Sequence, residues 1–207
     1  FSTEPLSAKT VLISDFATLS NFHTAVSPDS KVFGYMIKDV NVASDFKIEK
    51  FDGRFYGNGH KITGLQNGLF TEVSGAIIQG LKLEVNVNVT DKVNTGALVG
   101  DAENSFIHRC EIIGDASRVQ NASTENVCTG GIVGSMKGGE ISVSCNKVTV
   151  VGNGSEVNSV GGIVGKAEDG AVIVDTYNWG NVTGSASGFT GGIFGTLQRS
   201  YVGTSYN

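Results

Sequence analysis

Apolar and polar residues alternate over short segments of this chain from about residue 51 onward, and this period of two predicts β-strands. The longest such segment covers residues 82–90, where Leu83, Val85, Val87 and Val89 fall on one face. Residues 67–207 carry no sustained stripe with the 3.6-residue period of a helix, and each glycine would cost about 1 kcal/mol inside a helix. We therefore expect an all-β fold built from short strands.

A glycine-rich phrase returns at a nearly constant interval. Its copies are LQNGLFT, NTGALVG, CTGGIVG, SVGGIVG and FTGGIFG, which end at residues 71, 100, 134, 165 and 195, so the steps are 29, 34, 31 and 30 residues. Two apolar columns keep their distance from the phrase: Val73, Ala102, Met136, Ala167, Leu197, and Ile78, Ile107, Ile141, Ile173, Val202. About three strands in each period of roughly 30 residues predict one coil of a β-solenoid. The frame of a leucine-rich repeat is missing.

The phrase places a small residue at the same position of each coil. Stacked coils lie about 4.8 Å apart, so the column Ala97, Gly131, Gly162 and Gly192 predicts a tight bend without room for larger side chains. Glycine also permits a positive φ at such a bend. A second column, formed by Asn146, Asn178 and Asn207, predicts a ladder of side-chain amides at a coil corner.

The first 50 residues follow another pattern. Residues 14–26 place Phe16, Leu19, Phe22 and Val26 on one side and offer Ser14 as an N-cap, which predicts a short amphipathic helix. Solenoids need atypical terminal units over the end of the core. We expect residues 1–50 to form an N-terminal cap and residues 51–207 to form about five coils, which continue beyond the C-terminus because the last repeat is incomplete.

Residues 51–65 read FDGRFYGNGHKITGL, and residues 176–184 read TYNWGNVTG. With the GGIVG copies, this frame resembles the GLUG-motif proteins of bacteria over about residues 10–207. The resemblance implies a right-handed parallel β-helix that is secreted or displayed on a cell surface, in adhesin-like proteins and in the non-catalytic regions of large surface peptidases. Tyr56 stands where the frame commonly has Asp, and Cys128 is an unusual lead-in to a GGIVG copy.

Charge and composition exclude several classes of partner. Among the 207 residues 17% are charged and the net charge is −5, so a basic stripe for nucleic acid is missing. No apolar run reaches the roughly 18 residues that span a bilayer, so membrane insertion of this segment is not expected. Cys110, Cys128 and Cys145 lack metal-ligand spacing; we expect buried small side chains, with one disulfide left open. No cofactor is expected.

Catalytic motifs are missing from the sequence. His23, His60 and His108 do not form H-E-x-x-H, and neither a G-x-S-x-G elbow nor a phosphate loop is present. His60 is expected to have a structural role in a tight turn. These observations predict that the protein is not an enzyme. The alternative is a carbohydrate-active β-helix enzyme, a polysaccharide lyase or glycoside hydrolase, with candidates Asp101, Glu103, His108, Arg109 and Glu111.

The turns after the glycine-rich phrase vary from coil to coil, and varied loops on a rigid scaffold are usual places for binding. The candidate binding residues there are Asp101, Glu103, Lys137, Glu168 and Asp169. A competing interpretation is a solvated charge ladder, because Glu103, Lys137 and Glu168 alternate in sign. Four sequons mark possible glycosylation, at Asn88, Asn121, Asn153 and Asn181.

The sequence thus predicts a non-catalytic domain of a larger protein, extracellular or on the cell surface. Its expected role is adhesion and ligand presentation, or that of a structural stalk. The expected partner is a protein or glycan ligand on a cell or matrix surface, which a stiff solenoid contacts along its lateral face.

Overall fold

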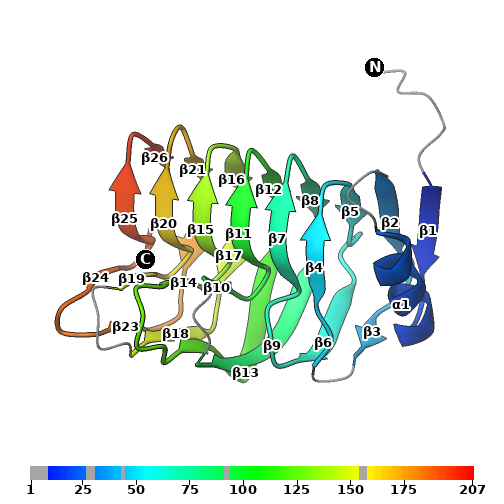
Figure 1. The fold of residues 1–207 in the computed structure, drawn as a ribbon, viewed down its shortest axis with the longest axis horizontal. Helices are drawn as coiled ribbons and strands as arrows, with labels where there is room; N and C mark the ends of the chain where they lie inside the picture. The colour runs from blue at the N-terminus through cyan, green and yellow to red at the C-terminus, as the bar shows by residue number, and fades with distance from the viewer. Residues whose placement is uncertain (1–8, 27–30, 43–44, 91–93, 154–157) are drawn as a thin grey trace.

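The computed structural model describes residues 9–26, 31–42, 45–90, 94–153 and 158–207. They form a right-handed parallel β-helix with one short helix at its N-terminal end (Figure 1), which confirms the predicted fold class. The structure has about four turns, slightly fewer than the five coils expected. Among the described residues, no helix has the length and hydrophobicity to cross a bilayer.

Four sheets run along the β-helix, numbered here in the order in which a coil passes through them. Sheet 1 contains β4 (Ile48–Phe51), β7 (Phe70–Ser74), β11 (Val99–Glu103), β15 (Val133–Lys137), β20 (Val164–Glu168) and β25 (Phe194–Gln198). Sheet 2 contains β1 (Lys9–Ile13), β2 (Val32–Met36), β5 (Arg54–Tyr56), β8 (Ile77–Gln79), β12 (Phe106–His108), β16 (Glu140–Ser142), β21 (Val172–Val174) and β26 (Tyr201–Gly203).

Sheets 3 and 4 form the remaining sides of the β-helix, and sheet 4 begins at β10. Sheet 3 contains β3 (Val40–Asn41), β6 (Lys61–Leu65), β9 (Lys82–Val89), β13 (Glu111–Asn121), β17 (Cys145–Asn146) and β22 (Tyr177–Asn178). Strand β18 (Thr149–Gly152) pairs with the end of β13, and β23 (Val182–Gly184) pairs with β18. Sheet 4 contains β10 (Thr95–Gly96), β14 (Cys128–Gly130), β19 (Ser159–Gly161) and β24 (Phe189–Gly191). Neighbouring strands pair in parallel, as between β9 and β13.

The apolar columns of the sequence form the core. Val73, Ala102, Met136 and Ala167 pair in register along sheet 1, and none is more than 4% exposed. The isoleucines of the second column pair in the same way along sheet 2, from Ile78 to Ile173. Each fully buried isoleucine stabilises the fold by about 1.5–3 kcal/mol. Apolar side chains at equivalent positions of successive coils therefore stack on one another and form most of the hydrophobic core.

Helix α1 (Phe16–Ala25) closes the N-terminal end of this core. Phe22 is fully buried, and its ring contacts those of Phe51 and Phe55 at centroid distances of 5.6 and 5.3 Å. Strands β2 and β3 of the same region extend sheets 2 and 3. Strand β4 runs across the expected boundary at residue 50 between the cap and the coils. That boundary stays a prediction.

The N-cap of α1 is Asp15 and not the expected Ser14. The Asp15 carboxylate accepts a hydrogen bond from the Thr18 backbone N–H at 2.8 Å, and the Thr18 hydroxyl accepts one from the Asp15 N–H at 3.0 Å. This reciprocal pair requires a spacing of three residues. Asp15 has that spacing to Thr18, whereas Ser14 directly follows strand β1.

The glycine column is a matter of space and not of backbone conformation. A Cβ atom on Gly131 would lie within 3.0 Å of the Gly162 carbonyl oxygen and of the Asn146 side chain. Gly162 has the same relation to Asn178. Neither glycine has a positive φ, so that part of the expectation is wrong. Most positive φ values fall in the turns between sheets 1 and 2 and between sheets 2 and 3, for example 89° at Gly170 and 66° at Gly80.

The predicted asparagine ladder is present. The Asn146 Nδ2 donates to the Asn178 Oδ1 at 2.7 Å, and the Asn178 Nδ2 donates to the Asn207 Oδ1 at 2.6 Å. Each of the two donors also reaches a backbone carbonyl two residues onward, at Val148 and Gly180. One coil earlier Ile112 pairs with Asn146 in register and ends the ladder. The glycines leave room for these amides at the coil corner.

Candidate functional site

Two columns of polar side chains follow the outer face of sheet 1. Strand register places Lys50, Glu72, Asp101, Ser135, Lys166 and Thr196 in one column. The other column contains Ser74, Glu103, Lys137, Glu168 and Gln198. Period-two alternation accounts for both, because each member lies beside an inward-facing apolar residue.

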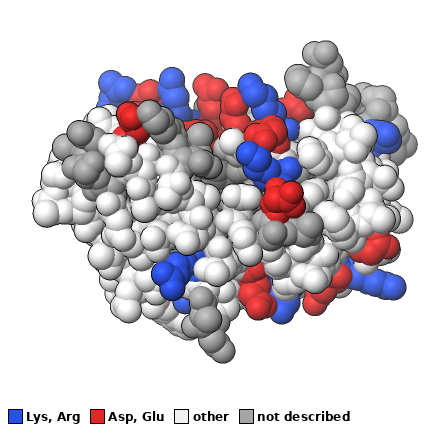
Figure 2. All heavy atoms as spheres, turned by 60° about the horizontal axis from the view of Figure 1, so that its bottom comes forward, with Lys and Arg blue, Asp and Glu red and all other residues white. Residues whose placement is uncertain are grey.

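A shallow hollow of about 250 Å³ opens on this face. Its lining side chains are Glu72, Val73, Asp101, Ala102, Glu103, Ser135, Lys137 and Glu168. The structure therefore brings together four of the five predicted binding residues, and Asp169 follows directly in the turn after β20. Figure 2 shows positive and negative side chains mixed along the upper edge of the molecule in that view.

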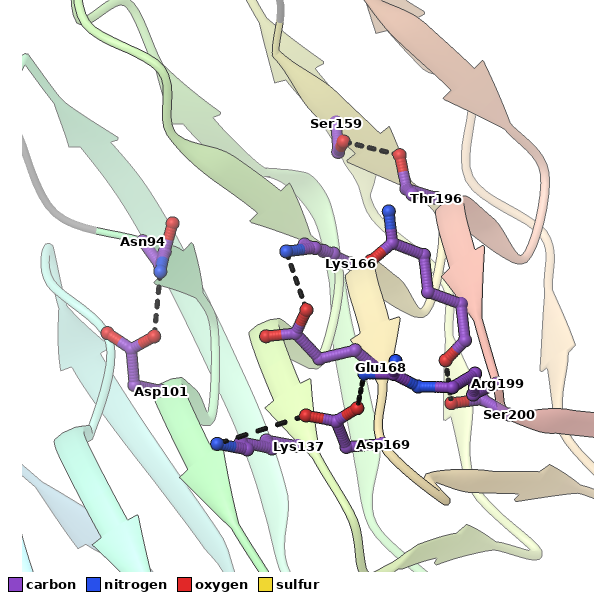
Figure 3. Close-up of polar contacts among 11 residues, drawn as sticks. Asn94, Asp101, Lys137, Ser159, Lys166, Glu168, Asp169, Thr196, Arg199 and Ser200 are labelled. Carbon is purple, nitrogen blue, oxygen red and sulfur yellow. Dashed lines mark hydrogen bonds and ion pairs between the residues drawn. The ribbon is translucent and has the colours of Figure 1, made fainter.

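The ion pairs on this face differ from a simple ladder along one column (Figure 3). Lys166 pairs with Glu168 of its own strand at 2.7 Å, and Lys137 reaches the Asp169 carboxylate at 3.8 Å. Arg199 forms an ion pair with Asp169 from the other side. Among the described residues, Glu103 has no ion pair with Lys137. Asp169, with a φ of 55°, thus places its carboxylate between Lys137 and Arg199, which strand register alone does not predict.

The carboxylates of the face have different proton affinities. Burial raises the pKa of Asp101, and the negative charge of Glu72 raises it further, while a hydrogen bond from the Asn94 Nδ2 at 2.7 Å opposes both. The hydrogen bond from Arg199 lowers the pKa of Asp169. Of these two aspartates, Asp101 is therefore the one whose surroundings favour the protonated form. Neither Asn94 nor Arg199 was predicted, because each reaches the face from outside the aligned columns.

The remaining catalytic candidates lie elsewhere. His108 is on β12 in sheet 2, where its Nδ1 lies 3.0 Å from the Ser142 hydroxyl. Glu111 is on β13 in sheet 3 and pairs with Lys147 at 3.3 Å. Arg109 occupies the turn between these strands with a φ of 52°. These three residues do not join Asp101 and Glu103 in one site.

His60 ties its turn to the N-terminal region. Its Nδ1 lies 3.2 Å from the Asp39 Oδ1, and the same oxygen accepts a hydrogen bond from the Lys61 N–H at 3.0 Å. The two hydrogen bonds lower the pKa of Asp39. This geometry fits a structural role for His60.

The three cysteines are free thiols. Burial raises the pKa of Cys110 to about 12 and that of Cys128 to about 11, so both stay protonated at neutral pH. Cys145 is buried beside Tyr177. In the described part of the chain, no group of three or more His, Cys, Asp or Glu residues could hold a metal ion.

The sequons differ in accessibility. Asn88, Asn153 and Asn181 are exposed. Asn121 is fully buried, and its Nδ2 donates to the Thr95 hydroxyl at 2.8 Å. A glycan has no room on Asn121 in the folded chain. Its burial follows from β13, where Val119 and Asn121 alternate onto the inner face, but the sequon alone does not show this.

The fold defines the chain as a right-handed parallel β-helix protein, and sheet 1 carries its charged face. In sequence, the chain is 25% identical over 226 aligned positions to an immunoglobulin A1 protease of Streptococcus sanguinis. The match covers 86% of this chain but only 12% of that protein's length. No family model matches, so the resemblance to GLUG-motif proteins stays a prediction.

A solved structure shares the fold. It is the crystal structure of a protein provisionally named an immunoglobulin A1 protease, from Bacteroides ovatus, with a TM-score of 0.55 and 17% identity. The similarity covers 92% of this chain and 74% of that one. Both relatives thus carry the name of a protease. This contradicts the prediction, drawn from missing motifs, that the protein is not an enzyme, because such motifs can lie in parts of a long protein outside the aligned region.

Proposed function

We propose that this chain is the β-helix portion of an extracellular or cell-surface protease of the immunoglobulin A1 protease kind. The observation that carries the proposal is the sequence similarity to such a protease across 86% of the chain. Immunoglobulins circulate outside cells, which supports an extracellular location. The GLUG-like frame at residues 51–65 supports the same location.

Within such an enzyme, the outer face of sheet 1 binds the protein or glycan ligand. The parallel coils form a stiff scaffold, and a rigid scaffold limits the entropy lost on binding. The hollow at Asp101 and Glu103 offers carboxylates, while Lys137 and Arg199 offer cations beside it. Exposed charges of both signs contribute to selection and to the association rate more than to affinity. The β-helix would hold the ligand while the rest of the enzyme acts on it.

Surface plasmon resonance of the full chain over immobilised immunoglobulin A1 tests this proposal. The double variant Glu103→Lys/Glu168→Lys reverses two charges on the face and should weaken binding by at least about tenfold. The control Glu84→Lys/Glu111→Lys makes the same charge change on sheet 3, away from the proposed binding face. The control should bind like the unaltered chain. No binding by the unaltered chain, or equal loss in both variants, would overturn the proposal.

One observation favours a second candidate, the glycan-cleaving enzyme. Glu72 and Asp101 pair across adjacent strands, and the pKa of Asp101 is raised. Retaining glycosidases use two carboxyl groups about 5–5.5 Å apart, one of them an acid with a raised pKa. Release of reducing ends from a polysaccharide panel, abolished by Asp101→Asn, would support this candidate. No release from any polysaccharide would reject it.

A further inference from the structure

Three aromatic rings gather on the outer side of sheet 3. Trp179 is the single tryptophan of the chain, and it is 65% exposed. Alternation turns Tyr177 and Trp179 outward, because Asn178 between them points into the asparagine ladder. The ring centroid of Tyr177 lies 4.9 Å from that of Trp179 and 5.6 Å from that of Tyr206. Contiguous exposed rings of this size are typical of a binding surface.

A cation holds the indole of Trp179 in place. The Lys147 Nζ lies over the Trp179 ring, 5.4 Å from its centroid. The same ammonium group pairs with the Glu111 carboxylate at 3.3 Å, which fixes Lys147 from the other side. These two contacts orient the indole before any ligand arrives, and a ring that is already oriented loses little entropy on binding.

Hydrogen-bonding side chains continue this surface along the outer face of sheet 3. Thr149 follows Lys147 by two residues on the same side of the strand. Strand register places Thr149 in a row with Asn86 and Arg118, and the next row contains Asn88, Gln120, Val151 and Thr183. Of these side chains, Arg118 is the charged one and Val151 the aliphatic one. Figure 2, in which the bottom of Figure 1 comes forward, shows a mostly uncharged surface toward the left of the molecule.

An uncharged sugar matches this surface better than a protein does. The core of a protein interface is about 65% apolar, whereas the two rows beside the aromatic rings consist mainly of amides and hydroxyls. A pyranose ring whose substituents are all equatorial presents a face of C–H bonds, which packs on an aromatic ring, and a rim of hydroxyls, which pair with amides and hydroxyls. Because Lys147 is already paired with Glu111, it is not a free cation for an acidic sugar.

We propose that Trp179, Tyr177 and the polar row at Thr149 form a binding site for an uncharged β-linked oligosaccharide. One pyranose ring stacks on Trp179, and Thr149 and Arg118 hydrogen-bond to hydroxyls of the sugars that follow. The site goes beyond the proposed function, because it lies on sheet 3 and uses none of the charged residues of sheet 1. It binds the sugar without cleaving it.

Isothermal titration calorimetry of the full chain with cellohexaose, chitohexaose and xylohexaose tests this inference, since the sugars of all three carry only equatorial substituents. At least one of them should bind with a Kd below about 1 mM. Trp179→Ala should raise that Kd by more than about tenfold. The control Phe106→Ala removes an aromatic ring on sheet 2 that is 51% exposed, and it should bind like the unaltered chain.

Thr149→Val provides a second variant, which removes one hydroxyl at nearly constant size and should weaken binding by about twofold to tenfold. Circular dichroism shows whether each variant is folded. Absence of binding by all three hexasaccharides would overturn the inference, as would unchanged binding by folded Trp179→Ala. Tighter binding of hexagalacturonate would overturn the assignment to an uncharged sugar.

This test is separate from the test of the proposed function. The variant Glu103→Lys/Glu168→Lys, which changes sheet 1, should bind the hexasaccharide like the unaltered chain. Loss of sugar binding in that variant would contradict a site on sheet 3.

Discussion

Gly162 lies against the side chain of Asn178, so closely that a Cβ atom on Gly162 would come within 3.0 Å of the Asn178 side-chain amide. The same amide is the central rung of the asparagine ladder. The repeated glycine therefore leaves the space that the repeated asparagine side chain occupies at the coil corner. The contribution of each residue to the free energy of unfolding can be measured with single variants.

Gly162→Val should destabilise the protein by more than about 2 kcal/mol, because the new side chain must displace either Asn178 or the Gly192 carbonyl. Urea denaturation measures the change. Gly170→Ala is the control for the loss of a glycine: a Cβ atom there meets nothing within 4 Å, although φ is 89°. A smaller loss is expected for the control. Equal losses would contradict the steric explanation, because the crowded position would then cost no more than the open one.

Asn178→Ala should cost about 2 kcal/mol, because it leaves the amides of both neighbouring rungs and the Gly180 carbonyl without their partner. Asn207→Ala removes only the terminal, exposed rung and should cost clearly less. Thermal melting of the two variants side by side provides the comparison. Similar shifts for both would contradict a cooperative ladder.

Stability should respond to pH with opposite signs at two aspartates. The raised pKa of Asp101 means that its ionisation destabilises the folded state, so Asp101→Asn should stabilise the protein at about pH 7. This advantage is lost as the pH falls through the raised folded value and is absent below the ordinary value of 3.8. The lowered pKa of Asp169 contributes stability above pH 3.8, which is lost as the pH falls through its folded value. Asp169→Asn should therefore destabilise the protein at neutral pH.

Urea titrations of both variants at several pH values measure these effects. The two substitutions each remove one negative charge from the same face, so each serves as the control for the other. If both substitutions changed the stability in the same direction at neutral pH, net charge would determine the effect, and not the local environment of each carboxylate.

Asp15→Ala should destabilise the protein, because it removes the acceptor for the Thr18 N–H at the first turn of α1. Ser14→Ala should have a smaller effect, since the Ser14 side chain accepts no N–H of that turn. Chemical denaturation distinguishes the two. A larger loss at Ser14 would contradict the capping box seen here.

Much of the fold could be predicted from the sequence because stacking in register forces equivalent positions to repeat. The columns that contain Met136 and Ile141 are visible as apolar residues at a fixed offset from a glycine-rich phrase, and the ladder through Asn146 is visible for the same reason. Clustering of Glu103, Lys137 and Glu168 also follows, since neighbours in a column must lie about 4.8 Å apart. Asp101 joins them because its column is the neighbouring one on the same face.

The sequence by itself therefore determined the solenoid, its columns and the face on which the charged residues gather. Only the tertiary structure decided where side chains outside those columns point. The φ at Asp169 directs its carboxylate toward Lys137 and Arg199, and alternation along β13 buries Asn121 despite its sequon. The repeated positions in the sequence determine the register between strands of successive coils. The conformation of a turn and the burial of a side chain depend on contacts between coils, which the sequence of a single repeat does not contain.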